Sequence, residues 1–138
     1  MSTTVSLADL PGRPCPIAAA LEIVGERWAL LVVREIALGA YRFGDIVRGT
    51  GAPRDRIAAR LKLLETAGVI DRIRYQDAPP RHEYRLTAAG EALVPVLDAL
   101  LSWGERFAVA DDDPKRQRRY RTFSGTTATP TATPEETR

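Results

Sequence analysis

The chain has 138 residues, of which 44% are hydrophobic and 28% are charged, and its formal net charge at pH 7 is +2. This length suits one domain with a single hydrophobic core, and no run reaches the roughly 18 apolar residues of a membrane span. One cysteine and one histidine exclude an intrachain disulfide, a multi-cysteine zinc site and the usual catalytic triads. Because the first ten residues also lack the features of a secretory signal, we expect a cytoplasmic protein that binds no metal, cofactor or membrane.

The positive charge is concentrated in the middle of the chain. Between Arg27 and Arg85 there are twelve Lys and Arg against seven Asp and Glu, and nearly every cation is arginine. The planar guanidinium suits phosphates and the edges of bases. This excess is compatible with binding to nucleic acid, although many solvated surfaces have a similar charge.

The N-terminal half predicts two helices after a flexible lead-in of residues 1–12, which ends in Pro-Gly. Apolar residues recur at Ile17, Leu21 and Val24, which indicates a short helix that begins at Pro16. A second helix follows from Arg27 to residue 39, and its density of apolar residues implies burial on more than one side.

The next segment has the pattern of a helix-turn-helix. Phe43, Ile46 and Val47 are spaced as one side of a very short helix, and Thr-Gly-Ala-Pro at 50–53 then breaks the chain. A further helix over residues 53–66 has its apolar side at Ile57, Leu61 and Leu64, with a glycine just past its end as a left-handed cap. Two helices joined by such a turn form a helix-turn-helix.

The C-terminal half predicts a wing and a long helix. Residues 69–86 indicate a β-hairpin with Pro79-Pro80 at its tip. Thr87 then caps a long terminal helix that is kinked at Pro95. The predicted fold is mainly α with one small hairpin, a winged helix-turn-helix over residues 13–110. Residues 111–138 are charged and then rich in Thr and Pro, and we expect a disordered tail there.

The helix over residues 53–66 carries the predicted DNA contacts, because the second helix of a helix-turn-helix enters the major groove and presents its N-terminal residues to the bases. The candidates on its outward side are Arg54, Asp55, Arg56, Ala59, Arg60 and Lys62. Arg54 and Arg56 are favoured for base contacts, since bidentate binding of guanine by arginine is the commonest specific contact. The alternative is a solvated helix face, in which Asp55 only favours the helix dipole.

The predicted wing adds five candidates that would contact phosphates or the minor groove beside the main site: Arg72, Arg74, Arg81, His82 and Arg85. Alternating charges are also common on exposed hairpins that bind nothing. His82 is expected to be a surface residue, because no second histidine or cysteine stands at metal spacing.

The terminal helix carries more apolar surface than one core contact needs, and an exposed apolar stripe usually marks a partner surface. We therefore expect a homodimer. The predicted dimerisation residues are Leu93, Leu97, Leu100, Trp103 and Phe107.

Several motifs follow one another from residue 15 to residue 104: Cys-Pro at 15 and 16, Gly-x-x-Trp at 25 to 28, Arg-Phe at 42 and 43, Pro-Pro-Arg at 79 to 81 with Glu-Tyr at 83 and 84, and Leu-Thr-x-x-Gly at 86 to 90. In these motifs the chain resembles the HxlR family of winged helix-turn-helix regulators. The resemblance implies a regulator, by default a repressor, that is dimeric through its first and last helices and binds a palindromic DNA operator. Pro53 and Asp55 depart from the family pattern, so the operator sequence does not carry over.

The resemblance also makes Cys15 a candidate sensor, because in some members the cysteine of the Cys-Pro pair responds to quinones, aldehydes or oxidants. The small reactive electrophile would be a further partner of the chain. The alternative is that Cys15 packs as a small apolar residue at the start of its helix.

Two functions from other classes remain as alternatives. The first is a winged helix that docks a protein and does not bind DNA. The second is an enzyme, which the sequence disfavours because it lacks a catalytic pair with histidine, a recognisable carboxylate pair and a glycine-rich phosphate loop.

Overall fold

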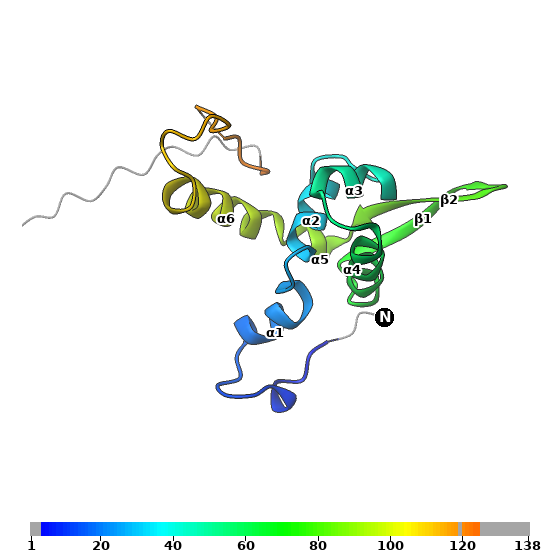
Figure 1. Ribbon diagram of the computed structural model, residues 1–138. Helices are drawn as coiled ribbons and strands as arrows, with labels where there is room; N and C mark the ends of the chain where they lie inside the picture. The colour runs from blue at the N-terminus through cyan, green and yellow to red at the C-terminus, as the bar shows by residue number, and fades with distance from the viewer. Residues whose placement is uncertain (1–3, 119, 125–138) are drawn as a thin grey trace, which may run out of the picture. The chain divides into compact units, whose positions relative to one another are not determined.

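The protein is described by a computed structural model that covers residues 4–118 and 120–124 (Figure 1). The chain divides after Val94 into two compact units. The first unit contains a 3-10 helix and several short helices followed by one hairpin, and the second contains the terminal helix. Across the residues that the structure describes, no helix has the length and apolar character that spanning a membrane requires.

The first unit has the element order of a winged helix-turn-helix. Its elements are η1 (Leu7–Asp9), α1 (Pro16–Val24), α2 (Ala29–Ala37), α3 (Phe43–Thr50), α4 (Arg54–Thr66), β1 (Ile70–Asp77), β2 (Pro80–Leu86) and α5 (Ala88–Glu91). The predicted lead-in thus contains η1. The proline that begins α1 has no N–H to leave unpaired, which suits the first position of a helix. Gly51 ends α3 with φ at 70°, a left-handed conformation that glycine adopts without steric cost.

The core of the first unit lies between α2, α3, α4 and β1. The largest fully buried side chains are Val32, Val33, Ile46, Ile57, Leu61, Leu64 and Ile70. The predicted apolar side of α4 is therefore confirmed. Each such side chain stabilises the fold by about 1.5–3 kcal/mol on burial, so the core itself determines which side of α4 faces outward.

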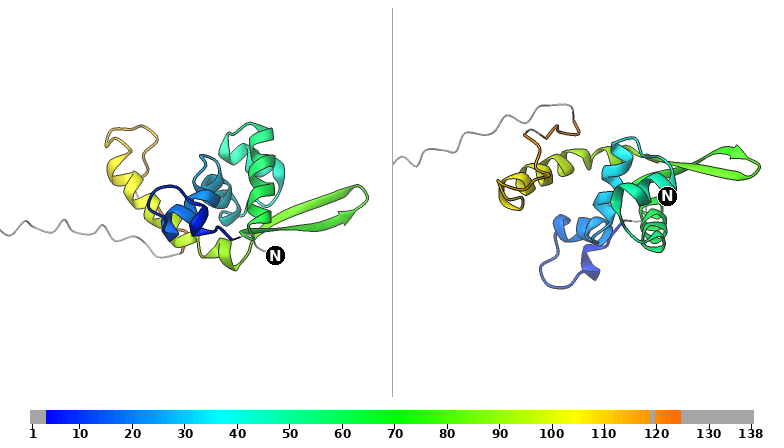
Figure 2. Two further views of the ribbon diagram at one scale, coloured as in Figure 1. Left: turned by 90° about the horizontal axis from the view of Figure 1, so that it is seen from below. Right: turned by 45° about the horizontal axis from the view of Figure 1, so that its top comes forward.

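The wing is an antiparallel hairpin of β1 and β2, as predicted. Ile70 pairs with Leu86 at its base, and Arg74 pairs with His82 toward its tip. The register is irregular between Arg74 and Gln76. In Figures 1 and 2 the hairpin projects beyond the helices of its unit as a long arm.

The predicted long helix after the wing is interrupted. Thr87 does cap a helix, since its Oγ1 accepts the N–H of Gly90 at 3.2 Å, but α5 is only four residues long. The chain then turns at Ala92 and Leu93, and α6 (Val94–Phe107) begins with Pro95 in its first turn. Proline cannot donate to the carbonyl four residues earlier and its ring clashes there. The helix consequently stops and restarts, and the predicted kink is instead a break.

The second unit consists of α6 and the described residues that follow it. Arg116 donates from Nη1 to the carbonyls of Glu105 and Val109, both at 3.0 Å. Asp98 accepts hydrogen bonds from the backbone N–H groups of Phe123 and Ser124 and from the Ser124 hydroxyl. Burial would raise the pKa of Asp98, but these three hydrogen bonds together lower it. The rest of the predicted tail, residues 119 and 125–138, lies outside the described residues.

Candidate nucleic-acid interface

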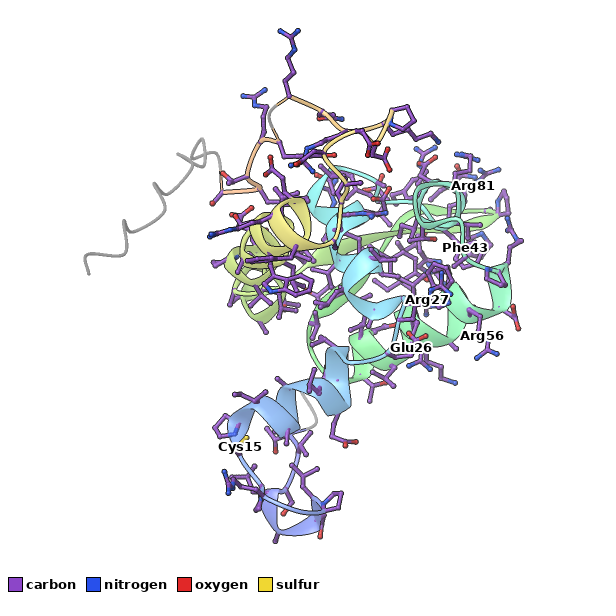
Figure 3. The ribbon with its side chains drawn as sticks, turned by 60° about the vertical axis from the view of Figure 1, so that its left-hand side comes forward. Cys15, Glu26, Arg27, Phe43, Arg56 and Arg81 are labelled. Carbon is purple, nitrogen blue, oxygen red and sulfur yellow. The ribbon has the colours of Figure 1, made fainter. Side chains whose placement is uncertain are left out.

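The outward side of α4 carries most of the predicted contacts. Arg54, Asp55, Arg56, Ala59 and Lys62 are all exposed, because the opposite side of the helix is packed in the core. Figure 3 shows Arg56 on the outer side of α4. α4 therefore carries two exposed arginines and one exposed lysine.

Arg54 is held by an aromatic ring. Its guanidinium carbon lies 4.9 Å from the ring centroid of Phe43. Phe43 is the first residue of α3 and Arg54 is the first residue of α4, so the N-terminal ends of the two helices of the helix-turn-helix meet here. At exposed sites a contact of this kind contributes about 0.5–1 kcal/mol.

Arg60 differs from the other predicted residues of α4. Its Nε lies 3.6 Å from Oε2 of Glu26, and the side chains of Arg60 and Glu26 are 24% and 34% exposed. The same Glu26 oxygen accepts the backbone N–H of Trp28 at 2.9 Å. Arg60 thus faces the junction of α1 and α2 and is engaged with an acid. A partly exposed pair adds only about 0–1 kcal/mol to stability. The negative charge of Glu26 nevertheless offsets the positive charge of the Arg60 guanidinium.

Three of the predicted wing residues have different surroundings. Arg74 is exposed and its Nη1 lies 3.9 Å from Oδ1 of Asp77. Arg72 lies beside Tyr84, where burial raises the tyrosine pKa and the charge of Arg72 opposes that rise. Arg81 is exposed close to the tip, and within the described part of the chain no ion pair engages its side chain.

The residues that lead into α3 were not among the predicted contacts. Arg42 is exposed, and its guanidinium carbon lies 4.9 Å from the ring centroid of Tyr75 on β1. Arg85 on β2 stacks on Tyr41 with a separation of 3.5 Å. One sequence feature could have indicated these residues: in the run Tyr-Arg-Phe at the start of a short helix, an arginine stands between two aromatic residues. Spacing along the chain identified only the apolar character of Phe43.

A further arginine lies two residues before α2. Arg27 is exposed, and its guanidinium carbon is 4.5 Å from the ring centroid of Trp28. In the view of Figure 3, Arg27, Phe43, Arg56 and Arg81 appear on the same side of the first unit.

Cys15 is at the N-cap of α1 and is half-buried. Its side chain forms no capping hydrogen bond to the helix. Figure 3 shows Cys15 at the end of α1 that is remote from Glu26 and Arg56. A signal received at Cys15 would therefore have to act on α4 through other residues.

The predicted dimerisation residues do not form one uniform set. Leu100, Trp103 and Phe107 are 48%, 61% and 63% exposed along α6, whereas Leu97 is only 7% exposed. Leu93 is half-buried in the break before α6. The rings of Trp103 and Phe107 are 5.7 Å apart. Of the five residues predicted for dimerisation, Leu100, Trp103 and Phe107 are the exposed ones on α6.

Comparison with known proteins connects this geometry to a family. A family model described as HxlR-like helix-turn-helix matches residues 23–112. The chain is 42% identical over 106 residues to an HTH-type transcriptional regulator of Mycobacterium tuberculosis. The matched segment covers 77% of this chain and 67% of the relative. It is also 33% identical over 106 residues to the HTH-type transcriptional regulator YtfH of Escherichia coli, with 76% and 84% covered.

Solved structures show the same fold. The transcription factor PA1607 is 35% identical with a TM-score of 0.71, over 83% of this chain and 80% of that one. The reduced form of the transcriptional regulator YodB from Bacillus subtilis is 29% identical with a TM-score of 0.58, over 67% and 93%. The redox regulator HypR in its reduced form is 28% identical with a TM-score of 0.59, over 67% and 92%.

Proposed function

The chain belongs to the HxlR-like helix-turn-helix family of transcriptional regulators, and we propose that it is a cytoplasmic, sequence-specific DNA-binding repressor that acts as a homodimer. The observation that supports DNA binding most directly is a pair of exposed arginines, Arg54 and Arg56. They lie in the first turn of a helix whose other side is buried. A recognition helix presents such N-terminal residues to base edges in the major groove. The small side chain of Ala59 permits close approach of the backbone, and Lys62 adds a contact to a phosphate.

The wing extends the proposed contact to the neighbouring groove or backbone. Arg81 and Arg74 are exposed on the outer half of the hairpin and suit phosphates or a narrow minor groove. Arg72 and Arg60 are engaged by Tyr84 and Glu26, so we assign them structural roles within the domain and no direct contact with DNA. In this proposal residues 13–110 form the DNA-binding and dimerisation domain.

Two exposed apolar stripes support the proposed homodimer. On α1, Ile17 and Leu21 are 72% and 57% exposed, and on α6 the stripe consists of Leu100, Trp103 and Phe107. Apolar side chains in such a row mark a partner surface. In a two-fold dimer the two recognition helices meet successive major grooves, with half-sites about 10 base pairs apart.

Selection of bound duplexes from a random pool tests this proposal. We expect the recovered sequences to share an inverted repeat whose half-sites are centred about 10 base pairs apart. The matched control is the Arg54→Ala/Arg56→Ala variant, which should enrich no guanine at the positions that the wild type selects. A pool that stays random with the wild-type protein would favour the alternative, a winged helix that docks a protein partner.

We further propose that Cys15 senses a reactive electrophile. Its position at the start of the exposed helix α1 supports this, as does the similarity to YodB, which has been solved in reduced and diamide-treated forms. In the reaction with N-ethylmaleimide, the Cys15 Sγ bonds to one carbon of the maleimide double bond, and the other carbon of that bond takes up a proton. We expect the adduct to weaken operator binding about tenfold, which is about 1.4 kcal/mol, in a fluorescence titration. Cys15→Ser should be unaffected by the reagent, and equal binding before and after alkylation of the wild type would remove the sensing role.

A further inference from the structure

The tripeptide Tyr41–Arg42–Phe43 leads into α3 and ends on its first residue. It is attached to the wing at Tyr41. The backbone N–H of Tyr84 donates to the carbonyl of Tyr41 at 2.7 Å. The guanidinium of Arg85 covers the ring of Tyr41 at 3.5 Å and also donates to Glu83 at 3.1 Å. A backbone hydrogen bond and a stacked ring thus join this residue to β2.

The next residue contacts the other strand. The guanidinium of Arg42 lies over Tyr75 of β1, and Arg42 is the N-cap of α3. One turn into α3, Ile46 is completely buried. The backbone of Phe43 is therefore fixed from both sides, by the wing before it and by the core after it.

Phe43 in turn holds the first arginine of α4. The ring is half-buried, whereas the Arg54 side chain over it is exposed. A free arginine side chain loses rotamer entropy when it is immobilised. Stacking before the DNA arrives removes part of that cost. A guanidinium that lies over a ring keeps its in-plane N–H groups for hydrogen bonds.

We propose that Phe43 is a positioning residue for base recognition: its ring holds the Arg54 guanidinium ready for bidentate binding to O6 and N7 of guanine. The inference rests on the proposed DNA-binding function and deepens it. Arg56 lies in the same helix turn, and among the described residues no aromatic ring is stacked on it. The base pair that Arg56 reads therefore serves as an internal control.

The test uses two full-length variants and one selected duplex. Phe43→Leu removes the ring and keeps an apolar side chain, whereas Phe43→Tyr keeps the ring. The base pair read by Arg54 is first defined as the one at which Arg54→Ala loses its preference. Affinities are then measured by fluorescence anisotropy for the selected duplex and for duplexes changed at that base pair or at the one read by Arg56.

We expect Phe43→Leu to reduce the preference for guanine at the Arg54 position about two- to fivefold and to leave the Arg56 position unchanged. Phe43→Tyr should retain the wild-type preference. In an Arg54→Ala background Phe43→Leu should have no further effect, because the two side chains act as one unit. The dependence of affinity on salt should not change, since no phosphate contact is removed.

Three results would overturn the proposal. The first is an equal loss of affinity for every duplex with Phe43→Leu, together with a lower Tm, which is the signature of a structural role. The second is an unchanged preference at the Arg54 position, and the third is a Phe43→Tyr variant that behaves like Phe43→Leu. If Phe43→Leu is poorly folded, Phe43→Met replaces it under the same criteria. A wild-type protein that binds no duplex at low salt overturns the proposed function itself, and is thereby distinguished from these three results.

Discussion

Replacing Trp103 with aspartate is expected to convert the proposed homodimer into a monomer and to weaken its binding to a palindromic site about a hundredfold or more. Trp103 is 61% exposed in the single chain and lies against Phe107 in the apolar stripe of α6. A tryptophan buries about 150–250 Å² in an interface. In the proposed homodimer each subunit would contribute one such residue, so a single substitution would alter the two-fold interface twice.

The loss of affinity follows from the loss of the second recognition helix. In a dimer, binding of one half-site places the other helix beside its own half-site, which raises its effective concentration. A monomer binds each half-site independently and lacks this advantage. An unpaired carboxylate within an apolar interface is also costly to desolvate, so concentration will not readily restore the dimer.

A neighbouring residue provides the matched control. Ser102 is exposed and, at 100° per residue, points to a different side of α6 from the apolar stripe. Ser102→Asp adds the same charge and should leave both the dimer and the affinity unchanged. Light scattering coupled to size exclusion gives the mass, and anisotropy with a two-half-site duplex gives the affinity. A Trp103→Asp protein that remains dimeric with wild-type affinity would show that α6 does not carry the association.

The order of elements and the orientation of α4 could be predicted from the sequence because both depend on local patterns. Ile57, Leu61 and Leu64 recur with the helical period, and their complete or nearly complete burial is the largest energetic factor in placing that helix. The hairpin could be predicted because alternation and a proline pair bound it. The same reasoning overestimated the helix at Pro95, because a pattern of apolar residues continues through a break that backbone chemistry imposes.

The partners of individual arginines could not be predicted, because they come from elements far apart in the sequence. Arg60 and Arg56 stand one turn apart on α4, yet only Arg60 meets an acid, and that acid is Glu26 before α2. Arg54 meets a ring from α3. Periodicity gives the direction of a side chain from its own helix and carries no information on what another element places there.

Apolar periodicity likewise does not distinguish a core side from a partner side. Ile17 and Leu21 on α1 have the same spacing as core residues and are exposed, whereas Leu97 on α6 was predicted for dimerisation and is buried. In both helices the apolar residues have the spacing of an amphipathic helix. Whether the apolar side is covered within the chain depends on packing, which the pattern of one helix does not determine.

The most direct test of DNA binding is a titration of a selected duplex and an unrelated duplex over a range of salt concentrations. The wild-type protein is compared with the Arg54→Ala/Arg56→Ala variant, and Arg60→Gln is the control because Glu26 already engages that charge. For the wild type we expect the logarithm of the association constant to fall linearly with the logarithm of the salt concentration, as phosphate contacts require.

Each of the two arginines should contribute roughly fivefold to 150-fold to the affinity for the selected duplex, since one bidentate base contact is worth about 1–3 kcal/mol. The double variant should therefore bind the selected duplex little better than the unrelated one, with a similar salt slope. Arg60→Gln should match the wild type in both affinity and slope. A wild-type protein that binds neither duplex at low salt, or a double variant that retains full preference for the selected duplex, would contradict the assignment of α4 as the recognition helix.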